Sequence, residues 1–119
     1  MRGKRSAGGR GVRVVLVTCP NKTVARRLAN ALIARRLAAC VNTLPGVESI
    51  FRWQGRVDRC REVLLIVKTT ASAVARLRRI VCALHPYDVP EVMALPVVAG
   101  HRPYLQWVAE SVRPVGRKA

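Results

Sequence analysis

Hydrophobic residues recur along the chain with the periods of strands and helices in turn. The β-branched segment from Val12 to Thr18 precedes Cys19-Pro20 and predicts a strand followed by a turn. From Lys22 to about Leu37, apolar residues return every three or four positions, which predicts an amphipathic helix with Asn21 as its N-cap. The same periods and turn residues predict the remaining elements: strand segments at 38–44 and 47–53 interrupted by Pro45-Gly46, a hairpin turn at 54–56, a strand at 57–70, a helix at 71–84 ended by His85-Pro86, a strand at 89–98 broken by two prolines, and a short helix at 103–111.

The predicted order is β-α-β-β-α-β with a short C-terminal helix, which is the α+β pattern of a ferredoxin-like sandwich. Its two main helices cover only one face of an antiparallel sheet, so the strands of a monomer should alternate apolar and polar residues. The strand at 62–70 does not, because Leu64 and Ile66 point to one side while Val63, Leu65 and Val67 point to the other. We therefore expect a partner subunit on the second face and a closed oligomer, since soluble monomers rarely expose large apolar patches.

The charge of the chain is concentrated at its two ends. The sequence has 22 Lys and Arg against 6 Asp and Glu, a formal charge of +16, and 8 of the 22 cations lie in 1–13 and 113–119. We predict flexible basic tails at 1–11 and 113–119 around one domain at 12–112. Most other cations fall on the polar sides of the predicted helices, which indicates solvated helix faces. The alternative is a surface that follows phosphates, with a loose and salt-dependent attraction for anions or nucleic acid.

The cysteines and the hydropathy pattern predict a cytoplasmic protein. The four cysteines are about twenty residues apart and form no Cys-x-x-Cys pair, which indicates reduced thiols in a reducing compartment. The apolar run at 14–17 is too short for a secretory signal, and no run is long enough for a membrane helix.

Six short motifs occur in order along the chain. They are Val-Thr-Cys-Pro-Asn at 17–21, Arg-Leu-Ala-Ala-Cys-Val-Asn at 36–42, Trp-Gln-Gly-Arg at 53–56, Glu62-Val63 with Lys68-Thr69, His-Pro-Tyr-Asp-Val-Pro-Glu at 85–91, and Tyr-Leu-Gln-Trp-Val at 104–108. Together they closely resemble the CutA family, the divalent-cation tolerance proteins, over about residues 12–112. The resemblance implies a ferredoxin-like subunit in a compact homotrimer, similar in architecture to the PII signalling proteins, with the hairpin at 47–70 carrying much of the subunit contact.

Two residues are candidate metal ligands. Neutral imidazole is a common ligand for copper, zinc or nickel, and His85 stands between the second helix and Pro86. Some CutA proteins carry tandem histidines before Pro-Tyr that are proposed to bind copper, whereas this chain has Leu84-His85. The family also suggests a thiol of the first strand, here Cys19. The resemblance thus implies weak binding of Cu(II) or another divalent cation, and the alternative for His85 is a structural role at the helix end.

A second group of residues suggests a ligand cleft between subunits. Glu62 and Lys68 are six residues apart and share one face of a strand, where they form either a small-anion site or an ion pair. The resemblance implies that the whole group lines a ligand cleft between subunits. Its members are Trp53, Glu62, Lys68, Tyr87, Glu91 and Trp107. The alternative for the aromatic residues is packing in a subunit interface.

The sequence offers no nucleophile–base pair, phosphate loop or acid pair with defined roles, so we do not expect an enzyme. The leading prediction is a trimeric protein of divalent metal tolerance, with copper bound and not turned over. Two alternatives stay open. One is a signalling trimer that binds a small metabolite, similar to PII proteins. The other is a ferredoxin-like domain that binds nucleic acid without sequence preference, because no aromatic RNP1 segment is present.

Overall fold

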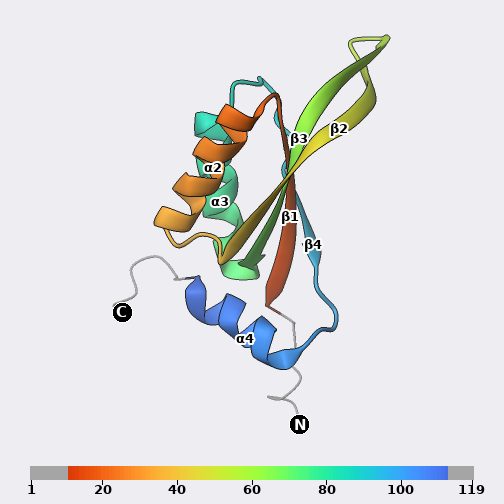
Figure 1. Ribbon diagram of the computed structural model, residues 1–119. Coiled ribbons are helices and arrows are strands. Elements are labelled where there is room, and N and C mark those ends of the chain that lie inside the picture. The colour runs from red at the N-terminus through yellow and green to blue at the C-terminus, as the bar shows by residue number, and fades with distance from the viewer. Residues whose placement is uncertain (1–10, 113–119) are drawn as a thin grey trace.

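The computed structural model describes residues 11–112 and gives the predicted order of elements (Figure 1). The elements are β1 (Val12–Cys19), α2 (Lys22–Ala34), β2 (Cys40–Trp53), β3 (Arg56–Thr70), a 3₁₀ turn η2 (Ala71–Ala73), α3 (Val74–Leu84), β4 (Met93–Pro96) and α4 (Arg102–Ser111). The predicted tails lie outside the described residues, except for Gly11. No helix within 11–112 has the length and apolar character needed to cross a membrane.

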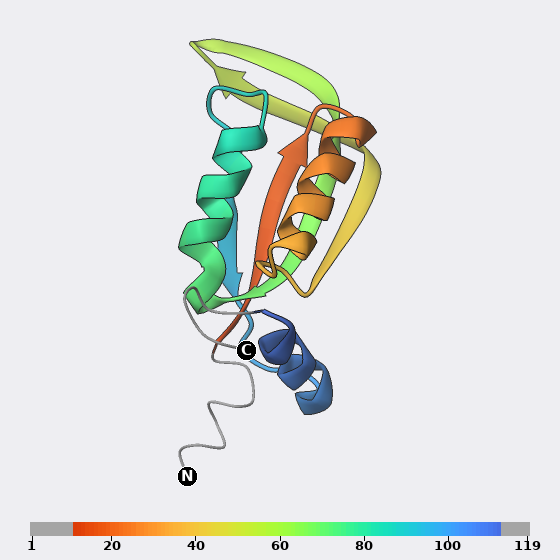
Figure 2. The same ribbon diagram turned by 90° about the vertical axis from the view of Figure 1, so that its left-hand side faces the viewer.

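The four strands form one antiparallel sheet in the order β2-β3-β1-β4. Helices α2 and α3 lie side by side on one face of this sheet, and α4 lies beyond their lower ends (Figures 1 and 2). The far parts of β2 and β3 extend past the other strands as a long hairpin that leans away from α2 and α3 (Figure 1). The predicted α+β sandwich with a C-terminal helix is therefore confirmed.

Helix α2 begins as predicted but ends one turn early. The side-chain oxygen of Asn21 accepts a hydrogen bond from the Val24 N–H at 2.9 Å, so the predicted N-cap is confirmed. The predicted end at Leu37 is wrong. Arg36 has a φ of 58°, a left-handed conformation that stops the helix, and the Leu37 N–H bonds back to the Leu32 carbonyl at 2.9 Å.

Strand β2 is continuous, and Pro45-Gly46 forms a bulge in it. Leu44 pairs with Leu64 and Val47 pairs with Glu62, so two residues of β2 stand opposite one residue of β3. Gly46 has a φ of 78°, which glycine adopts without strain. Since side chains alternate along a strand, the extra residue exchanges the faces of β2: even-numbered side chains share a face with Leu64 before the bulge, and odd-numbered ones do so after it.

Two further elements differ from expectation in length. The hairpin turn is confined to Gln54 and Gly55, with φ values of 51° and 79°, as a two-residue turn of type I′ requires. Strand β4 spans only Met93–Pro96, not the predicted 89–98. The residues between α3 and β4 run past the end of β1 instead, which places the segment after α3 beside the candidate site described below.

The core lies between the sheet and the two main helices. Odd-numbered residues of β1 and β3, including Val15, Val17, Leu65 and Val67, are fully buried on this side. They pack with the buried side chains of the helices, namely Ala25, Leu28 and Leu32 of α2 and Leu77 and Val81 of α3. Burying one such aliphatic side chain stabilises the fold by about 1.5–3 kcal/mol.

The opposite side of the sheet is also apolar, as the sequence predicts. This open face carries Leu16, Leu44, Leu64, Ile66, Met93 and Leu95, which the strand pairing places next to one another. Leu16, Leu64 and Ile66 are half-buried, whereas Leu44, Met93 and Leu95 are exposed by 51%, 51% and 45%. Helices α2 and α3 do not reach these side chains, because they lie on the other side of the sheet (Figure 1).

Candidate functional site

The end of β1 brings together polar residues from three separate segments. They are Cys19 at the end of β1, Glu62 on β3, and His85 and Tyr87 in the segment after α3, and we call these four residues the Glu62 cluster. The Tyr87 hydroxyl donates a 2.8 Å hydrogen bond to the Glu62 carboxylate. The rings of His85 and Tyr87 pack with their centroids 4.6 Å apart. The cluster thus combines a carboxylate, a phenol, an imidazole and a thiol at one end of the sheet.

Both ring nitrogens of His85 already have partners. Nδ1 accepts a hydrogen bond from the Tyr87 N–H at 3.1 Å, and Nε2 lies 2.8 Å from the Thr18 carbonyl oxygen. Because Nδ1 accepts, Nε2 carries the proton and donates it to that carbonyl. The buried imidazole therefore ties the segment after α3 to the last residues of β1. A metal ion would have to displace one of these bonds, so the geometry supports the structural role for His85 within a single chain.

Cys19 lies in the core and is held as a neutral thiol. Its side chain is fully buried among the residues packed against the helices. Burial, and after it the negative charge of Glu62, raises the pKa of the Cys19 thiol to about 11. Since the thiolate is the form that ligates metals, Cys19 is not poised for that role near neutral pH.

Glu62 is a buried carboxylate with a neutral partner. Its side chain is 8% exposed, and within residues 11–112 its hydrogen-bond partner is the Tyr87 hydroxyl, with no cation in ion-pair contact. Burial, and then the hydrogen bond and charge of Glu62, raise the pKa of Tyr87 well above its ordinary value. Tyr87 therefore remains a protonated donor at physiological pH.

Lys68 does not belong to this cluster. It lies six residues further along β3, about 20 Å away at the usual rise of a strand. Its ammonium group contacts the side-chain oxygen of Asn42, and the Cys40 sulfur lies 3.9 Å away. Within one chain, Glu62 and Lys68 therefore do not form the ion pair that the sequence left open.

The other predicted cleft residues lie on different elements of the fold. Trp53 is exposed at the hairpin end opposite Arg56. Trp107 is exposed on α4, where its ring packs at a tilt against Tyr104 with the centroids 5.6 Å apart. Glu91 is half-buried between α3 and β4. Among the six predicted cleft residues, the described chain shows one direct contact, the hydrogen bond between Tyr87 and Glu62.

Two residues next to Glu62 were not singled out in the sequence. Asp58 and Cys60 share the face of β3 on which Glu62 lies, because they precede it by four and two residues. Cys60 is exposed, and desolvation, then Glu62 and Asp58, raise the pKa of its thiol. Among residues 11–112, no group of three or more His, Cys, Asp or Glu side chains converges closely enough to hold a metal ion. The alternation of Asp58, Cys60 and Glu62 is the signal that sequence reasoning could have used.

Known proteins share this arrangement of elements. A profile of the family described as "CutA1 divalent ion tolerance protein" matches residues 13–111. The chain belongs to this family. A relative in Thermus thermophilus, the divalent-cation tolerance protein CutA, is 55% identical over 98 residues, covering 82% of this chain and 95% of that protein. Human protein CutA is 47% identical over 104 residues, or 87% of this chain, which spans only 58% of the human protein.

Solved structures of the CutA1 family have the same fold. The divalent cation tolerance protein Cut A1 of Thermus thermophilus superposes with a TM-score of 0.84 at 53% identity, over 86% of this chain and 99% of that one. CutA1 of Oryza sativa also gives a TM-score of 0.84, at 48% identity, over 88% of this chain and 96% of that one. The family description names divalent-ion tolerance and no reaction.

Proposed function

We propose that this chain serves divalent-ion tolerance by binding the ion weakly and without turnover. The site is the Glu62 cluster of a homotrimer, and the ligand is Cu(II) or another divalent cation. Membership of the CutA1 family supports the link to divalent ions. The observation that carries the proposal is the Glu62 carboxylate, which is 8% exposed and has a neutral hydroxyl as its described partner.

A buried carboxylate without a cation is costly, and a divalent ion removes that cost. Carboxylate oxygens suit hard and borderline ions. The neighbouring Cys60 sulfur lies on the same face, but its thiol would have to lose its proton on metal binding before it could act as a softer donor. Asp58 adds negative charge further along the strand. With so few donors in one chain, water or a second copy completes the coordination, which explains weak binding. His85 and Cys19 then shape the site from behind, by fixing the segment after α3 and by filling the core.

The open face supports the trimeric part of the proposal. Six apolar side chains from all four strands lie together there, outside the core formed with α2 and α3. A second copy on this face would bury them, and the contact would extend towards the hairpin, where Glu62 and Trp53 lie.

The test is a titration of the metal-free protein with Cu(II) by calorimetry, comparing wild type with Glu62→Gln. We expect the substitution to weaken Cu(II) binding at least about tenfold, which corresponds to about 1.4 kcal/mol of binding free energy. The reason is that glutamine keeps the size of the side chain but loses the negative charge that attracts the ion. Glu48→Gln is the matched control, because Glu48 is an exposed carboxylate on the other face of the hairpin. Thermal unfolding of each variant without metal shows whether the fold is intact.

Equal Cu(II) affinity in wild type and a folded Glu62→Gln would refute the site. Equal loss in both variants would mean that Cu(II) responds to overall charge and not to the cluster. Tyr87→Phe separates the carboxylate from its hydrogen bond: we expect it to keep most of the Cu(II) affinity, because the charge of Glu62 remains.

We also propose a cytoplasmic location. It is supported by the four cysteines, all of which are free thiols in the structure. Relatives are named as chloroplastic in Oryza sativa and periplasmic in Archaeoglobus fulgidus, so location varies among family members. Fractionation of the source cells, with detection of the native protein in the soluble cytoplasmic fraction, tests this.

A further inference from the structure

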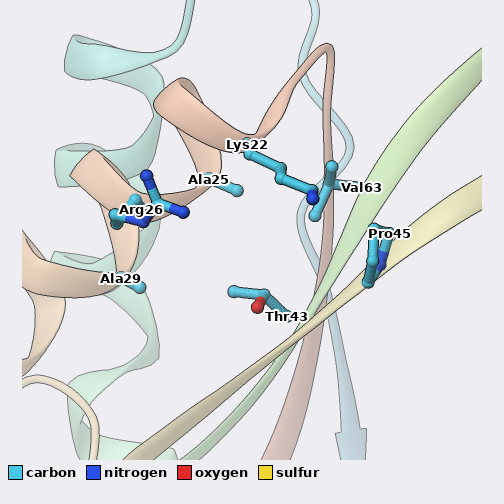
Figure 3. A pocket seen from close by; sticks show the side chains of 7 residues that line it. All are labelled: Lys22, Ala25, Arg26, Ala29, Thr43, Pro45 and Val63. Carbon is cyan, nitrogen blue, oxygen red and sulfur yellow. The ribbon is translucent and has the colours of Figure 1, made fainter.

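A hollow lies between the start of α2 and the bulge of β2, on the helix-facing side of the sheet. Its volume is about 270 Å³. Ala25 and Ala29 leave room on the α2 side because their side chains are small, and Pro45 and Val63 form the opposite wall (Figure 3). The hollow is separate from the open face, and neither the Glu62 cluster nor the proposed subunit contact uses it.

Two cations and a hydroxyl line this hollow. Lys22 extends from the first turn of α2 towards Val63, Arg26 lies one turn further along α2, and Thr43 lies on β2, below the two cations in the view (Figure 3). No acidic residue is among the lining residues. Within the described part of the chain, neither Lys22 nor Arg26 has a hydrogen-bond or ion-pair partner.

The two cations beside the hollow stand in an unfavourable electrostatic setting. Lys22 and Arg26 are four residues apart on one helix, a spacing at which like charges repel. Lys22 also stands in the first turn of α2, at the positive end of the helix dipole, and that turn has no acidic residue to offset its charge. A bound anion would relieve both effects at once.

We propose that this hollow binds a compact phosphate-bearing anion, of which inorganic pyrophosphate is the simplest example. The Lys22 ammonium, the Arg26 guanidinium and the Thr43 hydroxyl all donate hydrogen bonds, and phosphate oxygens accept them. The volume is near the lower limit of about 300 Å³ for small-molecule pockets. It therefore suits a small anion better than a whole nucleotide with its base and ribose.

The neighbouring surface strengthens the attraction. Arg61 lies two residues before Val63 on the same face of β3. Arg59 lies on that face too, two residues nearer to the hairpin turn. On this face of the described hairpin, Glu48 is the single acidic residue, and it lies opposite Arg61. The excess of positive charge raises the local concentration of anions around the hollow.

The experiment is a calorimetric titration of the full chain with sodium pyrophosphate at low salt and with EDTA, so that metal ions play no part. We expect Lys22→Ala combined with Arg26→Ala to weaken binding at least about tenfold. Arg78→Ala with Arg79→Ala is the matched control: it removes the same charge from exposed positions on α3, and it should change the affinity less than about twofold. Ala29→Leu, which fills the hollow and keeps both cations, should also weaken pyrophosphate binding about tenfold.

Equal weakening in the two double variants would overturn the proposal, because the anion would then sense only overall charge. Unchanged binding in Ala29→Leu would overturn it too, since the hollow would not be the site. A short single-stranded RNA serves as the second probe. If RNA binds and pyrophosphate does not, the phosphate-sized site is refuted and the basic surface acts as a nucleic-acid surface instead.

Discussion

At the scale of single residues, the two predicted metal ligands are both committed to the fold. His85 uses Nδ1 and Nε2 to join the Tyr87 N–H and the Thr18 carbonyl, and Cys19 is a core thiol with a raised pKa. Glu62 is the buried carboxylate of the cluster, and its described hydrogen-bond partner is the neutral Tyr87 hydroxyl. Imidazole chemistry and the family resemblance pointed to the histidine and the cysteine, whereas the surroundings point to the carboxylate.

The first prediction concerns alkaline pH. An unfolded tyrosine ionises near pH 10, but burial, and then Glu62, raise the pKa of Tyr87 in the fold. Between these two pKa values the unfolded chain has lost a proton that the folded chain keeps, so the free energy of unfolding falls as pH rises. Cys19 adds the same loss between its ordinary pKa of 9.0 and about 11.

Urea unfolding at about pH 8 and at about pH 10.5 measures this decline in the free energy of unfolding. The two values lie below and above the ordinary pKa values of cysteine and tyrosine, which apply to the unfolded chain. Stability should be fully present at the lower pH and reduced at the higher one. Tyr87→Phe removes one of the groups whose pKa the fold raises and should make the decline smaller. A wild type with the same free energy of unfolding at both values would contradict the raised pKa values.

At the scale of elements, the bulge at Pro45-Gly46 joins two differently faced parts of β2 into one strand. Gly46 has a φ of 78°, and a Cβ added there would meet no atom within 4 Å. Any cost of a side chain at this position therefore comes from the left-handed backbone and not from crowding.

We expect Gly46→Ala to lower the free energy of unfolding by about 1–2 kcal/mol, the usual cost of a left-handed conformation with a Cβ. Chemical denaturation measures it. Gly11→Ala is the control, because it also meets no atom within 4 Å but has no left-handed φ. If the two variants lose the same stability, the bulge does not require glycine.

The elements were largely predictable because each follows a local period, a cap or a turn residue. Asn21, the turn at Gln54-Gly55 and the stop at His85 are local signals, and all three are confirmed. The end of α2 was missed because apolar spacing continues to Leu37, although Arg36 adopts a left-handed conformation. The length of β4 was overestimated because the apolar residues predicted as strand at 89–98 extend beyond Met93–Pro96 into the loops on either side.

The candidate site was predictable only in part. The pairing of Glu62 with Tyr87 lies within the group chosen from the sequence, and the structure brings these two together. The bond from His85 to the Thr18 carbonyl joins positions 67 residues apart and leaves no pattern in the sequence. The separation of Lys68 from Glu62 was missed because sharing a face does not mean sharing a site.

At the scale of the whole molecule, the open face is the feature that a single chain leaves unexplained. Its apolar side chains come from all four strands, and the hairpin projects beyond them (Figure 1). A surface of this kind is typical of subunit contacts, and it is the basis for the proposed trimer.

Ile66→Lys should break this assembly. It places a charge at the centre of the open face, between Leu16 on β1 and Asn42 on β2. Sedimentation velocity should show wild type near three times 13.1 kDa and the variant near the single-chain mass. Ile33→Lys is the control, since Ile33 is exposed on α2, on the other side of the sheet. A wild type that sediments as one chain, or an Ile66→Lys trimer, would contradict the proposed contact.

The bulge in β2 also decides how the hairpin sorts its chemistry. Because of the additional residue, Phe51 and Trp53 share a face with Glu62, while Arg52 joins Arg59 and Arg61 on the reverse. In a β2 of regular pleat, the two aromatic rings and Arg52 would change places. One irregular step in the backbone thus places two aromatic rings on the side of the hairpin that carries Asp58 and Glu62, and gathers three arginines on the side that leads towards the hollow beside α2.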